Sequence, residues 1–422
     1  MKRKLYIIVF VLVACTTGLF AQRQTKSPFS RFGYGEMYSF SNAYTQAMGG
    51  IGVGVFSPVQ IHFANPANQS SVQKESFLFN VGLGANVRKL QEESGSATVT
   101  SVGLETMSLA FPIIENRWGC AVGILPFNSV GYEMNYTDSV ASYSYSGNGG
   151  VNQVVLSTGV RLFKGLSIGA NAAYLFGTTS YTGENTFKES TAFNSRKQLE
   201  YKTLGFLWNA GIQYKWQLNE TKSLTFGATI RTPQQLTYRE TQKFGSYVVN
   251  GVLEIAKDTV STVTQKSTTD IPMEVAFGVS YSVENALLLG VDAGFQNWSD
   301  VSCYGKVDAD LQQTKYVKLG GEIIPNYKST KFYQRIPLRL GVHYSDLPIM
   351  YQYGGETEQL CEYGVSVGTR IKPKQNQNGL AIALDFGRRG NSSLAKSLQE
   401  TYVLLKLNVT LQEVWFTKRK IN

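Results

Sequence analysis

The chain is 422 residues long, carries a net charge of +10 and contains four cysteines. Its basic residues are scattered along the sequence without a concentrated patch, which disfavours a nucleic-acid partner and favours an anionic membrane surface. Beyond residue 21 it keeps three cysteines, Cys120, Cys303 and Cys361. They match neither a disulfide framework nor a metal knuckle, so we expect them to be structural and unpaired.

Met1–Ala21 has the features of a secretory signal. Lys2–Lys4 form a positive region, and Leu5–Ala14 form an apolar core that is too short to span a bilayer as a helix. Cleavage after Ala21 removes three basic residues and lowers the net charge from +10 to +7. An alternative stays open, because Leu12–Cys15 resembles a lipoprotein signal in which Cys15 is lipidated. No long apolar run follows, so we expect no transmembrane helix in the mature chain.

Residues 22–72 do not alternate and are rich in Gly, Ser, Asn and Phe. Gly49–Gly54 has G-x-G spacing, but no strand–helix context supports a nucleotide site. The segment is either a free periplasmic extension or a plug inside a barrel. The plug is favoured by a group of aromatic residues suited to burial: Phe29, Phe32, Tyr34, Phe40 and Tyr44.

The rest of the chain consists of short stretches in which apolar and polar residues alternate. Thr203–Trp216 is the clearest, with all but Leu207 in phase, and successive strand side chains point to opposite faces. One face carries Leu204, Phe206, Trp208, Ala210, Ile212, Tyr214 and Trp216. Fourteen strands are predicted near 77–90, 98–113, 117–137, 150–162, 166–180, 198–216, 223–240, 265–281, 286–298, 311–324, 333–345, 359–372, 378–389 and 399–411.

The connections between these strands alternate in length. Those near 114–116, 163–165, 217–222, 282–285, 325–332 and 373–377 are short, whereas those near 91–97, 138–149, 181–197, 241–264, 299–310, 346–358 and 390–398 are long. An even strand number with long loops at one end is typical of bacterial outer-membrane barrels. The 23 Phe, 24 Tyr and 5 Trp suffice for two aromatic girdles, and glycines on inward faces leave room in a lumen. We therefore predict an all-β fold, a 14-stranded antiparallel transmembrane β-barrel (73–412) with an N-terminal hatch (22–72) and a periplasmic tail (413–422).

Four motifs in this order resemble the FadL-type outer-membrane channels for long-chain fatty acids and other hydrophobic compounds, and more narrowly a branch common in Bacteroidetes. They are Asn65-Pro66-Ala67; Ser108-Leu109-Ala110-Phe111-Pro112-Ile113; Asp292 through Gln296-Asn297-Trp298-Ser299; and Leu319-Gly320-Gly321-Glu322 followed by Pro325-Asn326 and Arg339-Leu340-Gly341. The resemblance covers nearly the whole mature chain. Trp415–Lys420 departs from barrels that end in a terminal aromatic residue.

The resemblance implies a hatch inside the barrel, marked by Asn65, Pro66 and Ala67, and a lateral gap where the third strand is interrupted. Pro126, Phe127, Asn128 and Ser129 lie inside the predicted third strand. Proline cannot donate a hydrogen bond to a neighbouring strand, so this stretch is the candidate for the gap. The alternative is that Pro126 lies at a strand end near the membrane interface.

Polar candidates for the lumen are Asp292, His343, Arg370, Asp385 and Arg389. A charge that faced lipid near the midplane would cost about 2–4 kcal/mol for Arg, which favours their inward placement. They either form a salt-bridge network that fills the lumen and holds the plug, or bind the head group of a ligand. His343 and Ser345 share a face, but no third residue completes a catalytic arrangement, so we expect no enzyme, no cofactor and no metal site.

Two functions are consistent with these features. The first is a passive channel for hydrophobic or amphipathic, fatty-acid-like molecules, with lateral exit near Pro126 and outer-membrane lipids and lipopolysaccharide as neighbours. The second is an interaction barrel that serves as a subunit of an outer-membrane secretion or assembly complex. A continuous apolar tunnel favours transport, whereas a filled polar lumen favours the interaction barrel. The longest predicted loop, near 241–264, would be a lid in one case and a docking surface in the other.

Overall fold

The structure, a computed structural model, describes residues 25–73, 76–93, 95–189, 192–250, 253–299, 301–304, 306–307, 311–353, 355–372, 378–390 and 398–414. The predicted signal Met1–Ala21, with Cys15, lies outside the described residues, as does Trp415–Lys420 in the predicted tail. None of the described helices is long and apolar enough to cross a membrane.

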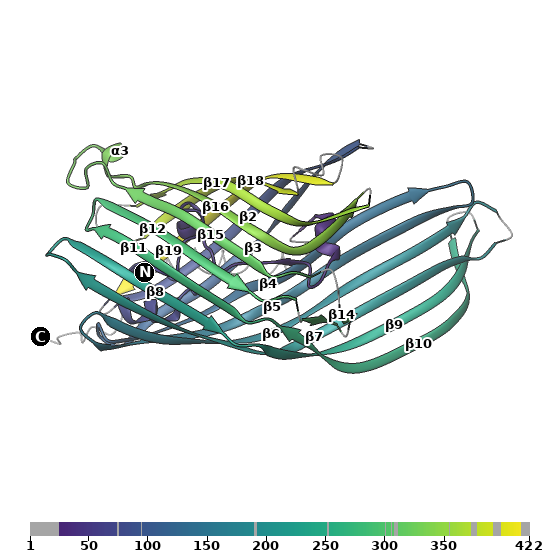
Figure 1. The fold of residues 1–422 in the computed structure, drawn as a ribbon, viewed down its shortest axis with the longest axis horizontal. Coiled ribbons are helices and arrows are strands. Elements are labelled where there is room, and N and C mark those ends of the chain that lie inside the picture. The colour runs from purple at the N-terminus through teal and green to yellow at the C-terminus, as the bar shows by residue number, and fades with distance from the viewer. Residues whose placement is uncertain are drawn as a thin grey trace, which may run out of the picture.

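The strands form one closed antiparallel barrel, in which β19 pairs with β2 (Figure 1). Two crossings of the wall are each interrupted once. One is divided into β8 and β9 at Thr232-Pro233, and the other into β10 and β11 at Pro272-Met273. If each complete crossing is counted as one stave, the barrel has fourteen staves, as predicted. Both interruptions contain a proline, which lacks the N–H that a ladder requires. The wall strands are β2 (Ser76–Glu92), β3 (Gly95–Ile114), β4 (Trp118–Thr137), β5 (Ala141–Phe163), β6 (Leu166–Phe187), β7 (Asn194–Gln217), β8 (Lys222–Arg231), β9 (Gln234–Asn250), β10 (Leu253–Ile271), β11 (Glu274–Val283), β12 (Leu287–Gln296), β15 (Thr314–Ile323), β16 (Leu338–Tyr353), β17 (Glu356–Ile371), β18 (Gly379–Gly390) and β19 (Gln399–Val414).

Strand β7 confirms the predicted alternation. Phe206 is 72% exposed and Trp208 50%, whereas Thr203 and Gln213 are each 1% exposed. Leu207, the residue out of phase, is 5% exposed and packs in an apolar cluster inside the barrel. The outward face is therefore apolar and suited to lipid, and the inward face packs against the contents of the lumen.

Most of the predicted long loops are extensions of the strands, and this part of the prediction is wrong. Residues 241–264 were expected as a loop, but β9 and β10 pair through this region as far as Asn250↔Leu253. This hairpin projects far beyond the shorter staves on the opposite side (Figure 1). The predicted strand 333–345 also begins later, at Leu338, after the one-turn helix α3 (Phe332–Arg335). Strand ends that lie beyond the membrane carry no apolar face, so alternation of hydrophobicity cannot locate them.

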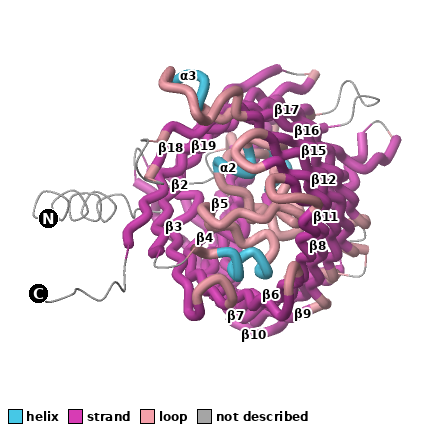
Figure 2. Tube along the Cα trace, turned by 90° about the vertical axis from the view of Figure 1, so that its left-hand side faces the viewer, coloured by secondary structure: helices cyan, strands magenta, loops and turns pink. Residues whose placement is uncertain are grey.

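The described N-terminal residues lie inside the barrel and contact its inner wall (Figure 2). Their short elements are η1 (Pro28–Arg31), β1 (Glu36–Met37), α2 (Ala43–Gln46) and η2 (Pro66–Ser71). A Cβ atom at Gly227 on the wall would collide with the carbonyl oxygen of Val53, and one at Gly211 would collide with the side chain of Asn65. The inward glycines therefore provide room that the N-terminal segment occupies.

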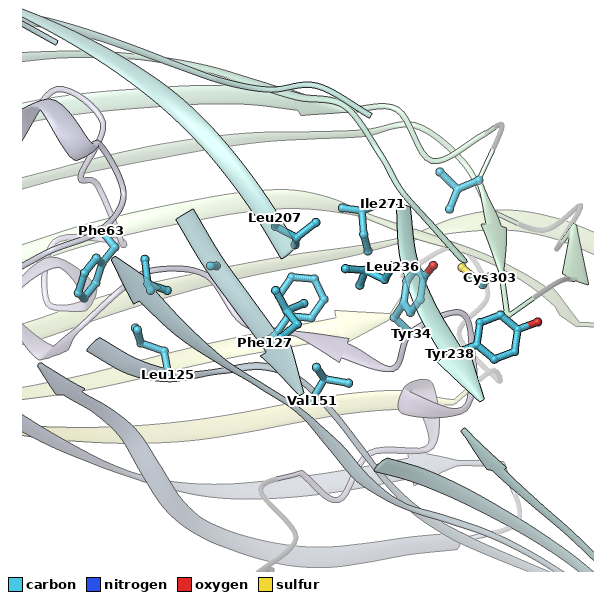
Figure 3. Close-up of a cluster of buried hydrophobic side chains, with 14 of the residues drawn as sticks. Tyr34, Phe63, Leu125, Phe127, Val151, Leu207, Leu236, Tyr238, Ile271 and Cys303 are labelled. Carbon is cyan, nitrogen blue, oxygen red and sulfur yellow. The ribbon is translucent and has the colours of Figure 1, made fainter. Parts of the chain in front are cut away.

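Several described residues between β12 and β15 pack inside the end of the barrel from which the β9–β10 hairpin projects, which is called the outer mouth. This segment contains β13 (Ser302–Cys303) and β14 (Lys306–Val307), and its Trp298 and Tyr304 are buried. The Tyr304 ring stacks on Tyr201 of β7 with centroids 4.3 Å apart. Figure 3 shows Cys303 of this segment in the same apolar cluster as Tyr34 of the N-terminal segment and Tyr238 of β9. Aromatic side chains from the wall, from the N-terminal segment and from the segment between β12 and β15 thus pack together at the outer mouth.

Candidate functional site

The ladder between β3 and β4 covers only part of the two strands, and the stretch beyond it is a gap in their pairing. The two strands pair from Ile114↔Trp118 only as far as Met107↔Ile124. Beyond that point β3 continues to Gly95 paired with β2 alone, and β4 continues to Thr137 paired with β5. Within the described residues, β3 therefore has a free edge that faces the side of the barrel.

The N-terminal segment takes the place of β3 beside the outer half of β4. Strand β1 pairs with it through Glu36↔Ser129 and Met37↔Asn128. The Tyr38 N–H donates to the Phe127 carbonyl over 3.0 Å, and the Ser27 N–H donates to the Gly131 carbonyl over 2.7 Å. An unpaired backbone group is costly in lipid, so this pairing stabilises an edge of β4 that the gap would otherwise expose.

The predicted gap residues lie at this place. Pro126 pairs with Asn152 of β5, Phe127 is bulged out of register, and Asn128 resumes the ladder opposite Val151. The Asn128 side chain bridges the two neighbours, since its Nδ2 donates to the Tyr34 carbonyl over 2.6 Å and its Oδ1 accepts from the Val151 N–H over 2.7 Å. The structure therefore places these residues at a bulge of β4 beside the N-terminal segment, and their role in a lateral gap stays a prediction.

A cavity of about 400 Å³ lies inside the barrel, and residues of β3 and β4 beyond the end of their shared ladder contribute to its lining. Gly103 and Leu104 of β3 and Phe127 of β4 line its side nearest the gap. Ionisable side chains also line it, among them Glu36, Arg88, Glu105, Asp292, Lys318, His343, Glu362, Asp385, Arg389 and Lys406. The lining thus mixes apolar and charged side chains and is not a continuous apolar tunnel.

A buried ion network ties the N-terminal segment to the wall next to the gap. Glu36 pairs with Arg88 of β2 and with Arg389 of β18, each at 2.8 Å. Arg88 also pairs with Glu400 of β19 at 2.9 Å, and Arg389 pairs with Glu362 of β17 at 2.8 Å. The two arginines therefore share three carboxylates, and Glu36 is the member that belongs to the N-terminal segment.

Further along the lumen, two predicted aspartates also contact the N-terminal segment. Asp292 of β12 accepts hydrogen bonds from the backbone N–H groups of Gly52, Val53 and Gly54, at 2.6, 2.8 and 3.3 Å. Asp385 of β18 accepts from the Gln46 side chain at 2.8 Å. With Arg389, three of the five predicted lumen residues hold this segment.

The other two predicted lumen residues have separate surroundings. His343 Nε2 lies 3.2 Å from the Tyr402 hydroxyl, and its Nδ1 lies 3.8 Å from Asp385. Arg370 is buried, and Arg339 and Tyr44 lie close enough to interact electrostatically with its guanidinium group. Arg339, which pairs with Glu322 at 2.7 Å, lies over the Tyr44 ring at 4.3 Å. The five candidates therefore line one lumen but do not converge on one point.

The motif Asn65-Pro66-Ala67 begins the helix η2 against the inner wall. Asn65 has an extended backbone and is fully buried, and its Oδ1 accepts from the Ala67 N–H over 3.1 Å. Its Nδ2 donates to Val53 within the segment and to the Ile212 carbonyl on the wall. The motif thus fastens the segment to β7, while its assignment as the marker of a hatch stays a prediction.

The sequence did not point to Glu36, Arg88, Glu362 and Glu400 as site residues. Arg88 and Glu400 each belong to the alternate residues of their strand that face inward, so alternation alone could have assigned them to the lumen. The pairing itself joins residues 312 positions apart, which no local pattern can reveal.

The described residues show no arrangement for metal binding, since no group of three or more His, Cys, Asp or Glu side chains among them could hold an ion. His343 and Ser345 are not hydrogen-bonded to each other, since Ser345 donates to the Asp346 carbonyl and His343 Nε2 lies beside the Tyr402 hydroxyl. Cys120, Cys303 and Cys361 are thiols rather than members of disulfides.

Solved structures of similar fold include a toluene transporter and a monoaromatic hydrocarbon channel. The toluene transporter TodX of Pseudomonas putida is 15% identical, with a TM-score of 0.58 over 90% of this chain and 99% of that one. The CymD monoaromatic hydrocarbon channel is 15% identical (TM-score 0.56, 87% and 96%), and a Pseudomonas aeruginosa FadL homologue is 12% identical (0.56, 91% and 100%). At this identity the likeness establishes the FadL-type barrel fold.

No curated protein matches the sequence. A family model described as BamG matches it from residue 1 to residue 422, which is the full length of the chain. The chain is therefore an outer-membrane β-barrel that belongs to the BamG family.

Proposed function

We propose that this barrel is a channel that admits an amphipathic or hydrophobic molecule to its lumen and releases it sideways between β3 and β4. The observation that carries the proposal is the place where the ladder ends at Met107↔Ile124, because the cavity is lined by residues of β3 beyond that point. The similar structures include channels described as transporting toluene and monoaromatic hydrocarbons, which supports the same class of ligand here.

The route needs a movement of the N-terminal segment, because that segment pairs with the outer half of β4. Residues 25–72 act as the hatch in this mechanism. Displacement of β1 (Glu36–Met37) would free the β4 edge and join the cavity to the gap. The ion pairs of Glu36 set the energy of this step, since breaking a buried pair leaves an uncompensated charge and costs about 3–5 kcal/mol.

The test is to fill the opening without touching the ion network. Gly103→Trp places a bulky ring on the inner face of β3 beside the gap, whereas Val102→Trp places the same ring on the outer face, where Val102 is exposed. In a bacterial strain that lacks other channels of this fold, Gly103→Trp should lower the uptake of radiolabelled oleate and toluene at least tenfold. Val102→Trp should leave uptake unchanged, and equal uptake in both variants would refute lateral passage.

A second function is favoured by one observation, the filled and charged lumen. The N-terminal segment lies directly on wall glycines and is tied by Glu36, Asp292 and Asp385, which suits a rigid scaffold in an outer-membrane complex. Under this alternative, the protein should co-purify with a stoichiometric outer-membrane partner after mild solubilisation. Wild-type cells should then show no more uptake of either probe than cells without the protein.

A further inference from the structure

Lys318 of β15 is a cavity-lining cation that lies directly opposite Asp292 in the β12–β15 ladder but makes no ion pair with it. Its ammonium lies 4.8 Å from the centre of the Tyr316 ring, and no carboxylate oxygen in the described part of the chain lies within 4.0 Å of it. The other basic residues of the cavity are all paired with glutamates: Arg88, Arg231, Arg389 and Lys406. The Asp292 carboxylate is engaged by the backbone N–H groups of the N-terminal segment. A charge in a shielded site is costly unless it is paired, so the Lys318 ammonium can take an anionic group of a ligand in the cavity.

Asp385 is the matching carboxylate on the other side of His343. It accepts from Gln46 and Ser366 at 2.8 and 3.1 Å, both neutral donors, and no lysine or arginine of the described residues lies within 4.0 Å. Its Oδ1 lies 3.8 Å from His343 Nδ1, and that nitrogen has no hydrogen-bond partner. His343 in turn lies directly opposite Lys318 in the β15–β16 ladder.

We propose that the cavity takes an amphiphile with a zwitterionic head group, such as a phosphoethanolamine, with its anionic group against Lys318 and its ammonium against Asp385. This rests on the proposed channel function and names its substrate class. Directly opposed residues have Cβ atoms about 4.5–5.5 Å apart, and both charges flank His343, so one compact head group can reach them. Asp292 adds a second carboxylate to the same wall, which disfavours a simple fatty-acid anion.

The shape of the cavity agrees with this ligand. Its volume of about 400 Å³ falls within the range of small-molecule sites, about 300–1,000 Å³. Met37, Leu104, Phe127 and Leu404 line the cavity with apolar side chains. The start of an acyl chain would pack on these residues, while the remainder passed through the gap into the membrane.

The experiment compares probes that share one oleoyl chain and differ only in the head group. Native mass spectrometry and titration calorimetry of the full chain in detergent would use 1-oleoyl-lysophosphatidylethanolamine, 1-oleoyl-lysophosphatidylglycerol and oleate, with oleylamine as the cationic probe. The zwitterionic probe should bind at least tenfold more tightly than any of the others. Heat-modifiable electrophoresis would establish that each variant is folded.

The variants should exchange their preferences, which a folding defect cannot mimic. Lys318→Met should lose at least tenfold in affinity for the zwitterion and gain affinity for oleylamine. Asp385→Asn should also lose the zwitterion but gain affinity for lysophosphatidylglycerol. Lys318→Arg should retain wild-type binding, and so should Lys315→Met, which removes an outward-facing lysine from the same strand.

Two results would overturn the inference in different ways. If lysophosphatidylglycerol or oleate bound as tightly as the zwitterion, or if the preferences did not exchange, the head-group assignment would be wrong and the channel would stand. If no probe bound and Gly103→Trp left uptake unchanged, both the head-group assignment and the proposed channel function would be wrong.

Discussion

Single side chains on the wall decide how the N-terminal segment is held. Asp292 binds three successive N–H groups at Gly52–Gly54, where a carboxylate replaces the hydrogen bonds that a loop without secondary structure lacks. No such partner is visible in the sequence, because residues 52 and 292 are far apart. The inward placement of Asp292 was nevertheless predictable from the cost of a charge in lipid.

Removing this carboxylate should loosen the segment but spare the barrel. Asp292→Ala leaves three buried N–H groups without an acceptor, and each costs about 1–3 kcal/mol. We expect faster proteolysis within residues 45–60 and a raised ion conductance in planar bilayers, while the protein stays heat-modifiable. Asp258→Asn, on the exposed outer hairpin, is the control. Protection identical to that of the wild type would show that Asp292 does not hold the segment.

The facing of β7 gives a second test at the scale of one residue. Phe206→Lys introduces a charge on the lipid side at a cost of about 2–4 kcal/mol near the midplane. Asn209→Lys introduces the same charge on the side that lines the cavity. The first variant should yield far less folded barrel than the second, measured as the heat-modifiable fraction in isolated outer membranes. Equal yields would contradict the facing shown by the exposures of this strand.

At the scale of elements, the segment that follows β12 contacts the N-terminal segment directly. The Tyr34 hydroxyl and the Tyr304 N–H both bond to the Thr269 side chain, and the Tyr34 and Trp298 rings lie 6.0 Å apart. A Cβ atom built on Gly33 would lie 3.8 Å from the sulfur of the buried Cys303. A new cysteine at this position could therefore join the two elements, although its φ of +53° costs some stability.

Gly33→Cys should form a disulfide with the native Cys303, because a Cβ atom at residue 33 lies 3.8 Å from the Cys303 sulfur and a small movement lets the new sulfur reach it at the S–S bond length of about 2.0 Å. With Cys120 and Cys361 replaced by serine, the oxidised protein should take up oleate and toluene several-fold more slowly than the same protein after reduction. Gly33→Ser is the control, because it places a side chain at the same position of the backbone but cannot form the disulfide. If oxidation formed the crosslink without slowing uptake, the N-terminal segment would not need to move away from this loop.

The elements that sequence reasoning located are those in contact with lipid. Alternation marked all fourteen staves, because a stave must be apolar on one side wherever it crosses the bilayer. The same signal failed at residues 241–264, which form a paired hairpin. It also failed in the predicted loop 299–310, where Val301, Cys303 and Tyr304 are buried because they fold inward. It also gave no warning that β1 would replace β3 beside β4, since that pairing depends on a register between distant residues.

For the whole molecule, the N-terminal segment is the main obstacle to permeation. Deleting residues 25–60 removes Glu36 and the groups bound to Asp292, while the wall ladders stay intact. The deletion variant should still assemble, and its single-channel conductance should rise several-fold as the lumen fills with water. An assembled variant with wild-type conductance would show that the loop between β12 and β15, rather than this segment, closes the barrel.

The seam between β2 and β19 also has a consequence for biogenesis. Arg88 and Glu400 meet across this seam, where the first and last staves join, and Glu36 completes the cluster. The backbone around Met48 and Val53 lies directly against wall glycines. Such close packing favours closure of the nascent sheet around a segment that is already in place. A barrel that closed while empty would bring Arg88 and Glu400 together without Glu36. The absence of the segment would therefore first affect the pairing of β2 with β19, the last strands to close.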